Sequence, residues 1–192
     1  MTDFALYFDT GWHHILSWAA LDHILFIVAL SAIYGIHNWK QVLVLVTAFT
    51  IGHSLTLALS VYDVIRFNEK WVEFLIPCTI IATGIFNLLV KDFRRKSLRI
   101  NYFLALFFGL IHGMGFANSI RFMLVKGQAI AIPLISFNIG LEAGQIIVVA
   151  FILLTSYILV NKVGVKRKWW VAALSITAIL FAVLMVKNRW PF

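Results

Sequence analysis

The chain has 192 residues, of which 62% are hydrophobic and only 12% are charged. Soluble domains are usually about 45–50% apolar and about 25% charged, so this composition excludes an ordinary soluble protein and predicts an integral membrane protein. The net charge of +8 does not indicate nucleic-acid binding, because the lysines and arginines lie between the apolar runs. The single cysteine, Cys78, excludes an internal disulfide and a multi-cysteine metal cluster.

Apolar runs of the length that crosses a bilayer, about 20 residues, recur along the chain. They are Ile15–Ile36, Gln41–Val61, Val72–Val90, Tyr102–Met123, Ile130–Val160 and Trp169–Val186. The fifth run is long enough to be tilted, kinked or extended beyond the bilayer. The sequence therefore predicts an all-α, multi-pass membrane bundle of about six transmembrane helices, forming one domain over residues 1–192.

The basic residues between these runs are distributed unequally. Ten follow the first, third and fifth runs: Lys40, Lys91, Arg94, Arg95, Lys96, Arg99, Lys162, Lys166, Arg167 and Lys168. Six lie on the opposite side: Arg66, Lys70, Arg121, Lys126, Lys187 and Arg189. Because basic connections favour the cytoplasm, both termini are predicted to face outward, to the periplasm.

Two carboxylates, Asp22 and Glu142, lie well inside apolar runs, whereas no lysine or arginine does. A charge at that depth costs about 2.5–3.5 kcal/mol on insertion scales, so such a residue indicates a functional site. The two carboxylates are therefore expected to have no fixed cationic partner in the sequence, so each must be protonated, bridged by a protonated histidine, or facing a cation that is not part of the chain.

Histidines lie at similar depth on three of the runs. In a regular first helix, His14 and Asp22 are separated by about 80° and His14 and His23 are nearly opposite, so Asp22 would share a site with one of the two more easily than with both. An irregular first turn would relax this restriction. His53 lies at the edge of a hydroxyl-bearing face that includes Thr50 and Ser54.

The fourth and fifth runs carry the remaining polar candidates. His112 is flanked by glycines, which let neighbouring helix backbones approach closely. Asn138, Glu142 and Gln145 share one helical face at positions i, i+4 and i+7. This stripe is typical of a polar pathway or site rather than of a lipid-facing surface.

Together these residues predict a metal site and a pathway next to it. The predicted metal ligands are His14, Asp22, His23, His53, His112 and Glu142, and the predicted pathway or second-layer residues are Thr50, Ser54, Asn138 and Gln145. Imidazole and carboxylate donors without thiolate suit nickel, cobalt, zinc or ferrous ions and do not suit copper(I).

Four segments, over roughly residues 11–160, resemble the HupE/UreJ family of bacterial membrane proteins: Asp22–Phe26, Thr47–Leu57, His112–Ala117 and Phe137–Gln145. Glu73 and Asn87 also fit the family pattern. The resemblance implies a multi-pass protein of the bacterial inner membrane, linked to nickel or cobalt uptake for hydrogenase and urease. The hydrogenase-linked members carry a second histidine and a glutamate where this chain has Phe116, Ala117 and Asn118.

These observations favour a transporter of a divalent ion, with Asp22, His53, His112 and Glu142 as the core site and His14 and His23 in capture or transfer. Its partners would be the lipid bilayer and the ion, and a homo-oligomer is compatible with the sequence. One alternative is a membrane-embedded zinc hydrolase in which Glu142 is the general base and Ser54 lies nearby. The other is a membrane assembly factor whose polar residues only hold the bundle together.

Overall fold

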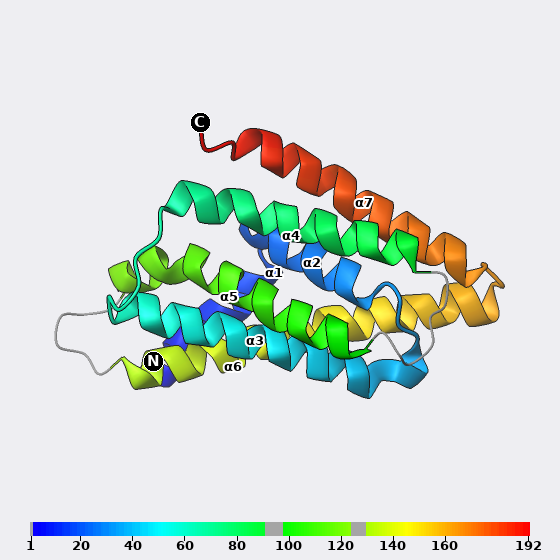
Figure 1. Ribbon diagram of the computed structural model, residues 1–192. Helices are drawn as coiled ribbons and strands as arrows, with labels where there is room; N and C mark the ends of the chain where they lie inside the picture. Colours follow the sequence, from blue (N-terminus) through cyan, green and yellow to red (C-terminus); the bar gives the residue numbers. More distant parts are fainter. Residues whose placement is uncertain (1, 91–97, 124–129) are drawn as a thin grey trace.

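The computed structural model describes residues 2–90, 98–123 and 130–192, which form a bundle of α-helices (Figure 1). The α-helices are α1 Asp3–Leu16, α2 Leu21–Ser31, α3 Trp39–Val61, α4 Glu69–Leu89, α5 Leu98–Met123, α6 Ala131–Ser156 and α7 Arg167–Asn188. Short 3₁₀ turns, η1 Trp18–Ala20 and η2 Ile36–Asn38, precede α2 and α3, and a π turn, η4 Tyr157–Lys162, continues α6. The expected all-α fold is confirmed.

Within the described ranges, four helical segments are long and apolar enough to cross a membrane: Ile36–Val61, Glu69–Leu89, Ala131–Lys162 and Arg167–Asn188. The bent pair of α1 and α2 makes a fifth if it counts as one span. The described apolar part of α5, Asn101–Ala117, is shorter. The chain is therefore a polytopic membrane protein, and the expected count of six spans is not confirmed.

The first expected span, Ile15–Ile36, is not one continuous helix. The helix that contains its start begins already at Asp3, where the hydroxyl of Thr2 accepts a hydrogen bond from the Ala5 amide. It ends at Leu16 because Ser17 has extended backbone angles (φ −82°, ψ 152°). After the η1 turn the chain continues in α2 at an angle of 67° to α1. The helical rotation that applies within a regular helix therefore does not extend across Ser17 to Ala20.

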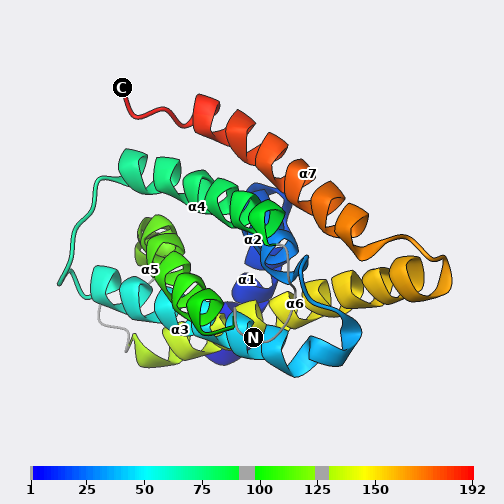
Figure 2. The ribbon, with the colours of Figure 1, turned by 45° about the vertical axis from the view of Figure 1, so that its right-hand side comes forward.

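The helices pack mainly in three pairs, α1 with α6, α3 with α5, and α4 with α7. The short helix α2 lies in the middle of the bundle and contacts α4, α6 and α7, as the two ribbon views show (Figures 1 and 2). Its residues from Leu25 to Leu30 are largely buried in the main hydrophobic core. The N-terminal end of α2 is thereby held at the centre of the molecule.

Two of these pairs are held together at glycines. A Cβ atom at Gly140 of α6 would lie 2.1 Å from the carbonyl oxygen of Phe8 on α1. One at Gly113 of α5 would lie 2.2 Å from the carbonyl oxygen of His53 on α3. The backbones of each pair therefore approach as closely as small residues in membrane helices allow. This close approach fixes the positions of the side chains next to the glycines.

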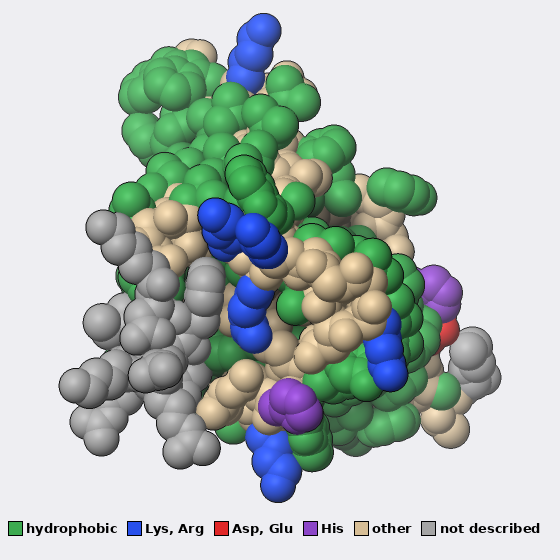
Figure 3. All heavy atoms as spheres, turned by 90° about the vertical axis from the view of Figure 1, so that its right-hand side faces the viewer, with side chains coloured by type: hydrophobic (Ala, Val, Ile, Leu, Met, Phe, Trp, Pro, Cys, Tyr) green, Lys and Arg blue, Asp and Glu red, His purple; other side chains and the backbone are tan. Residues whose placement is uncertain are grey.

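One end of the bundle carries several of the basic residues assigned to the cytoplasmic side. Figure 3 views this end, and Lys40, Lys162, Lys166 and Lys168 are exposed. Lys91, Arg94, Arg95, Lys96 and Lys126 lie outside the described residues. Both chain ends lie toward the opposite end of the bundle, where α3 passes to α4 (Figure 1). The outward orientation of the termini stays a prediction.

Candidate metal centre

The break between α1 and α2 brings His14 and His23 together. His14 lies in the last turn of α1 and His23 in the first turn of α2. Their ring centroids are 4.9 Å apart. A regular helix would place these two histidines on nearly opposite sides, and the irregular turn after Leu16 removes that restriction. Because α2 runs at 67° to α1, the rotation of about 100° per residue within one regular helix does not relate the directions of the two side chains.

The close pairing of α3 with α5 positions the other two buried histidines. His53 follows Gly52 on α3, and His112 precedes Gly113 on α5. The ring of His112 is 4.9 Å from that of His23, and the ring of His53 is 6.0 Å from that of His23. Both His53 and His112 are fully buried. Four helices therefore contribute one imidazole each to a shared region.

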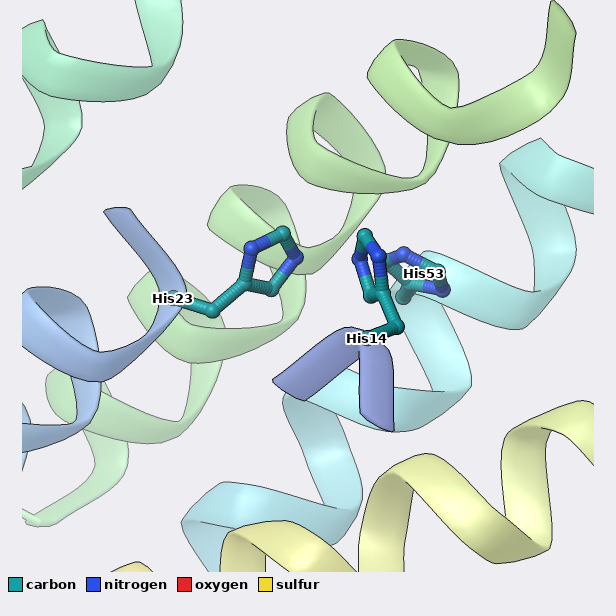
Figure 4. Close-up of side chains that lie close together, drawn as sticks. All are labelled: His14, His23 and His53. Carbon is teal, nitrogen blue, oxygen red and sulfur yellow. The ribbon is translucent and has the colours of Figure 1, made fainter. Parts of the chain in front are cut away.

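Three of these histidines are close enough to share one ion. His14, His23 and His53 each offer a ring nitrogen, and the three nitrogens lie within 4.8 Å of one another. Figure 4 shows the three side chains approaching one another from α1, α2 and α3. Neutral imidazole nitrogens are common ligands of nickel, cobalt and zinc. The group could hold a metal ion.

Ring nitrogens in this cluster lack hydrogen-bond partners among the described residues. They are His14 Nε2, His23 Nε2, His53 Nδ1, His53 Nε2 and His112 Nδ1. Buried polar atoms are nearly always hydrogen-bonded, and leaving one unpaired costs about 1–3 kcal/mol. Several unpaired nitrogens around one space therefore indicate a group that the protein chain does not itself supply.

Aromatic rings enclose the imidazoles. Phe116 lies 4.0 Å from the ring of His14, and Phe137 stacks on Phe116 at 5.0 Å. Phe26 and Phe49 pack against the ring of His112 at 5.4 and 5.1 Å. Phe116 stands at one of the positions where the sequence departs from the hydrogenase-linked pattern. Here it forms part of an apolar wall beside His14 rather than adding a ligand.

Asp22 holds His23 in place. Its Oδ1 atom accepts a hydrogen bond from the His23 amide at 2.8 Å and lies 2.8 Å from His23 Nδ1. Metal-binding histidines usually donate their second ring N–H to a carboxylate, which fixes the tautomer and raises ligand basicity. With Nδ1 directed to Asp22, the Nε2 atom of His23 is left for the shared region.

The second oxygen of Asp22 is paired with an arginine from the far end of the chain. Arg189 Nη1 lies 2.9 Å from Asp22 Oδ2. The expectation that Asp22 lacks a cationic partner from the chain was wrong. Arg189 follows the last residue of α7, outside the apolar run, and the packing of α7 on α2 and α4 brings it to Asp22.

A cavity of about 220 Å³ is lined by most of these groups, although His53 is not among its lining residues. Asp22 and Arg189, the two partners of the ion pair, line this cavity. Its other polar lining residues are the histidines His14, His23 and His112 and the acidic residue Glu73. We refer to it as the histidine cavity. Glu73 and Arg189 were not among the residues predicted for the site. Glu73 had been noted only for its fit to the family pattern, and no local signal marked Arg189.

A comparison with protein families identifies the chain. The family model described as HupE / UreJ protein matches residues 1–192. The chain belongs to the HupE/UreJ family. No curated protein and no solved structure matches it. The match covers the whole chain, so all four histidines of the cavity region lie within the HupE/UreJ match.

Glu142 lies apart from the histidines of this HupE/UreJ protein. It lines a groove of about 510 Å³ between α3 and α6, together with Thr47, Thr50, Ser54 and Asn138. We refer to this as the α3–α6 groove. Glu142 Oε1 accepts a hydrogen bond from the Thr47 hydroxyl at 2.6 Å. Since Gly140 faces α1, Glu142 is rotated by about 200° from that face and points toward α3 instead.

The other predicted pathway residues lie along the same side of α3 and α6. The Thr50 hydroxyl donates to Gln145 Oε1 at 2.8 Å, and Gln145 is fully buried. The Ser54 hydroxyl donates to the Thr50 carbonyl of its own helix, and the Asn138 amide donates to the Leu134 carbonyl. Thr50, Ser54 and Asn138 line the α3–α6 groove, and Gln145 is joined to it through Thr50.

Proposed function

We propose that the clustered histidines bind a divalent transition-metal ion next to the histidine cavity and that the protein carries this ion across the membrane. The observation that carries the proposal is the set of unpartnered imidazole nitrogens on buried histidines. A divalent ion satisfies several such nitrogens at once and favours their neutral, deprotonated form. A polytopic bundle built around such a site suits transport.

The chemistry of the ligands limits which metal ions can bind. In this proposal the Nε2 atoms of His14 and His23 and one ring nitrogen of His53 bind it, while His112 is a further ligand or the next stop on its path. These donors suit nickel, cobalt and zinc. The resemblance to HupE/UreJ proteins favours nickel or cobalt as the transported ion.

The membrane arrangement completes the proposal. Counting α5 as a span and α1–α2 as another gives six passes, with both termini on the periplasmic side of a bacterial inner membrane. The acidic Glu73 would then lie near the outward end of the histidine cavity. Asn138, Gln145, Thr50 and Ser54 would line or support the path of the ion, and the protein would act alone or as a homo-oligomer.

Two residues that the hydrolase alternative requires at the metal site do not line the histidine cavity. Glu142, its general base, lines the α3–α6 groove rather than the histidine cavity. The Ser54 hydroxyl donates to the backbone of its own helix. The assembly-factor alternative offers no account of the unpartnered nitrogens, because a cluster that only stabilised the bundle would pair them.

Metal uptake into vesicles reconstituted with the purified protein tests the proposal. We expect saturable uptake of nickel or cobalt by the wild type and its loss in His112→Ala. His37→Ala is the matched control, since His37 is exposed in η2 and does not line the histidine cavity. If wild-type vesicles take up none of nickel, cobalt and zinc, while the folded protein retains one ion, the transport proposal is wrong.

A further inference from the structure

The residues that follow α7 return to the mouth of the histidine cavity. We call residues 189–192 the strap. Trp190 packs edge-to-face against Phe74 at 5.3 Å, and Phe192 packs edge-to-face against Trp71 at 5.2 Å. Trp71 and Phe74 flank Glu73 in the first turns of α4. The strap therefore lies over the same end of α4 that contributes Glu73 to the cavity.

The strap inserts a cation into the site. The Arg189 guanidinium pairs with Asp22, the carboxylate that also holds His23. The side chain of Arg189 is only 27% exposed and that of Asp22 only 8%. A buried carboxylate needs a positive partner, and Arg189 supplies it when no ion is bound.

A bound divalent ion would change the electrostatic energy of the pair between Arg189 and Asp22. Bound to the neutral imidazoles, it would add two positive charges beside the guanidinium, and like charges at close range repel strongly in a partly buried site. If Arg189 leaves, the two carboxylates of the cavity, Asp22 and Glu73, match the charge of the ion. The charges therefore favour either Arg189 or the ion beside Asp22, but not both.

The rest of the strap is built to be released. Trp190 is 57% exposed and Phe192 is 87% exposed, so their contacts with α4 bury little apolar surface. Segments with few buried contacts open at low free-energy cost. Resting on the metal ion of the proposed function, we propose that Arg189 is a tethered cation that occupies Asp22 until a divalent ion displaces it, and that the strap closes the cavity mouth until then.

Calorimetric titration of cobalt into the purified full-length protein tests this. Arg189→Gln removes the competing charge, so we expect cobalt to bind at least about tenfold more tightly, equivalent to about 1.4 kcal/mol. The metal-free variant should melt at a lower temperature than the metal-free wild type, because Asp22 loses its counter-charge. A merely structural role for Arg189 would lower stability without tightening metal binding.

Two variants serve as controls. Arg66→Gln removes an arginine that is also paired with an aspartate, Asp63, but lies on the exposed α3–α4 connection, so cobalt affinity should not change. Arg189→Lys retains the charge and should keep the wild-type affinity. Trp190→Ala keeps Arg189 but loosens the strap, and we expect faster association of cobalt in stopped-flow measurements.

The outcomes separate this inference from the proposed function. If the wild type binds cobalt, His53→Ala abolishes binding and Arg189→Gln binds with equal or lower affinity, the tethered cation is wrong while the metal site stands. If neither the wild type nor Arg189→Gln binds cobalt, nickel or zinc, the proposed function is wrong and this inference with it. An unchanged association rate in Trp190→Ala would contradict closure by the strap.

Discussion

Asp22 and Glu142 are the two carboxylates inside apolar runs, and their surroundings differ. Asp22 is 6% exposed and engages His23 on one oxygen and Arg189 on the other. Glu142 is half-buried in the wider α3–α6 groove and accepts a hydrogen bond from Thr47. Unpartnered imidazole nitrogens gather near Asp22. Position within an apolar run therefore does not distinguish the two carboxylates, whereas the partners around each one do.

The strongest test of this contrast removes a central imidazole. We expect His53→Ala to weaken cobalt or nickel binding by at least about 100-fold, because changes to outer-layer partners alone cost about 10–100-fold. Circular dichroism must show that the variant keeps its helices, because removing the fully buried imidazole leaves a cavity. Calorimetric titration of the purified protein measures this, with His37→Ala as the control. Equal affinity in His53→Ala would exclude the cluster as the binding site.

Asp22→Asn tests the carboxylate on the histidine side of the comparison. The amide cannot hold His23 and balance charge as the carboxylate does, so metal affinity should fall by about 10–100-fold. The same titration provides the value. An unchanged affinity would show that Asp22 serves only to bind Arg189.

Thr50→Val tests the contact that joins the groove to the buried interior. Thr50 lines the groove, and its hydroxyl donates to the fully buried Gln145. Leaving that oxygen unpaired should reduce the free energy of unfolding by about 1–3 kcal/mol. Thr155→Val is the matched control, because the exposed Thr155 hydroxyl donates only to its own helix. Equal stability of both variants would mean that the contact contributes nothing.

Glu142→Gln should have the smallest effect on metal binding. Its side-chain oxygen can still accept a hydrogen bond from Thr47, and the groove is separate from the histidine cavity. We expect cobalt affinity to change by less than about threefold, or about 0.6 kcal/mol. A loss of cobalt affinity as large as that in His53→Ala would instead show that the groove and the histidine cavity form one site and that Glu142 is a metal ligand.

The sequence predicted the parts of this molecule that depend on local pattern. Long apolar runs predicted the helices, and the polar residues at membrane depth pointed to His53, His112 and Asp22. Gly113, beside His112, meets the backbone of α3. These features follow from periodicity and from the cost of burying polar groups.

The remaining features depend on tertiary structure. Ser17 to Ala20 contains neither proline nor glycine, so nothing in its pattern predicted the break that joins His14 to His23. Arg189 reaches Asp22 across 167 positions of sequence, and only the packing of α7 brings them together. The direction of Glu142 depends on which face of α6 packs against α1, which the polar stripe alone did not reveal.

The most direct test of the metal centre is X-ray absorption spectroscopy of the purified protein loaded with cobalt or nickel. We predict one retained ion per chain with several imidazole nitrogens as ligands, and fewer imidazoles in His23→Ala. A spectrum with oxygen ligands alone would place the ion elsewhere, for example at Glu142. Such a spectrum, or the absence of any retained ion, would contradict the account.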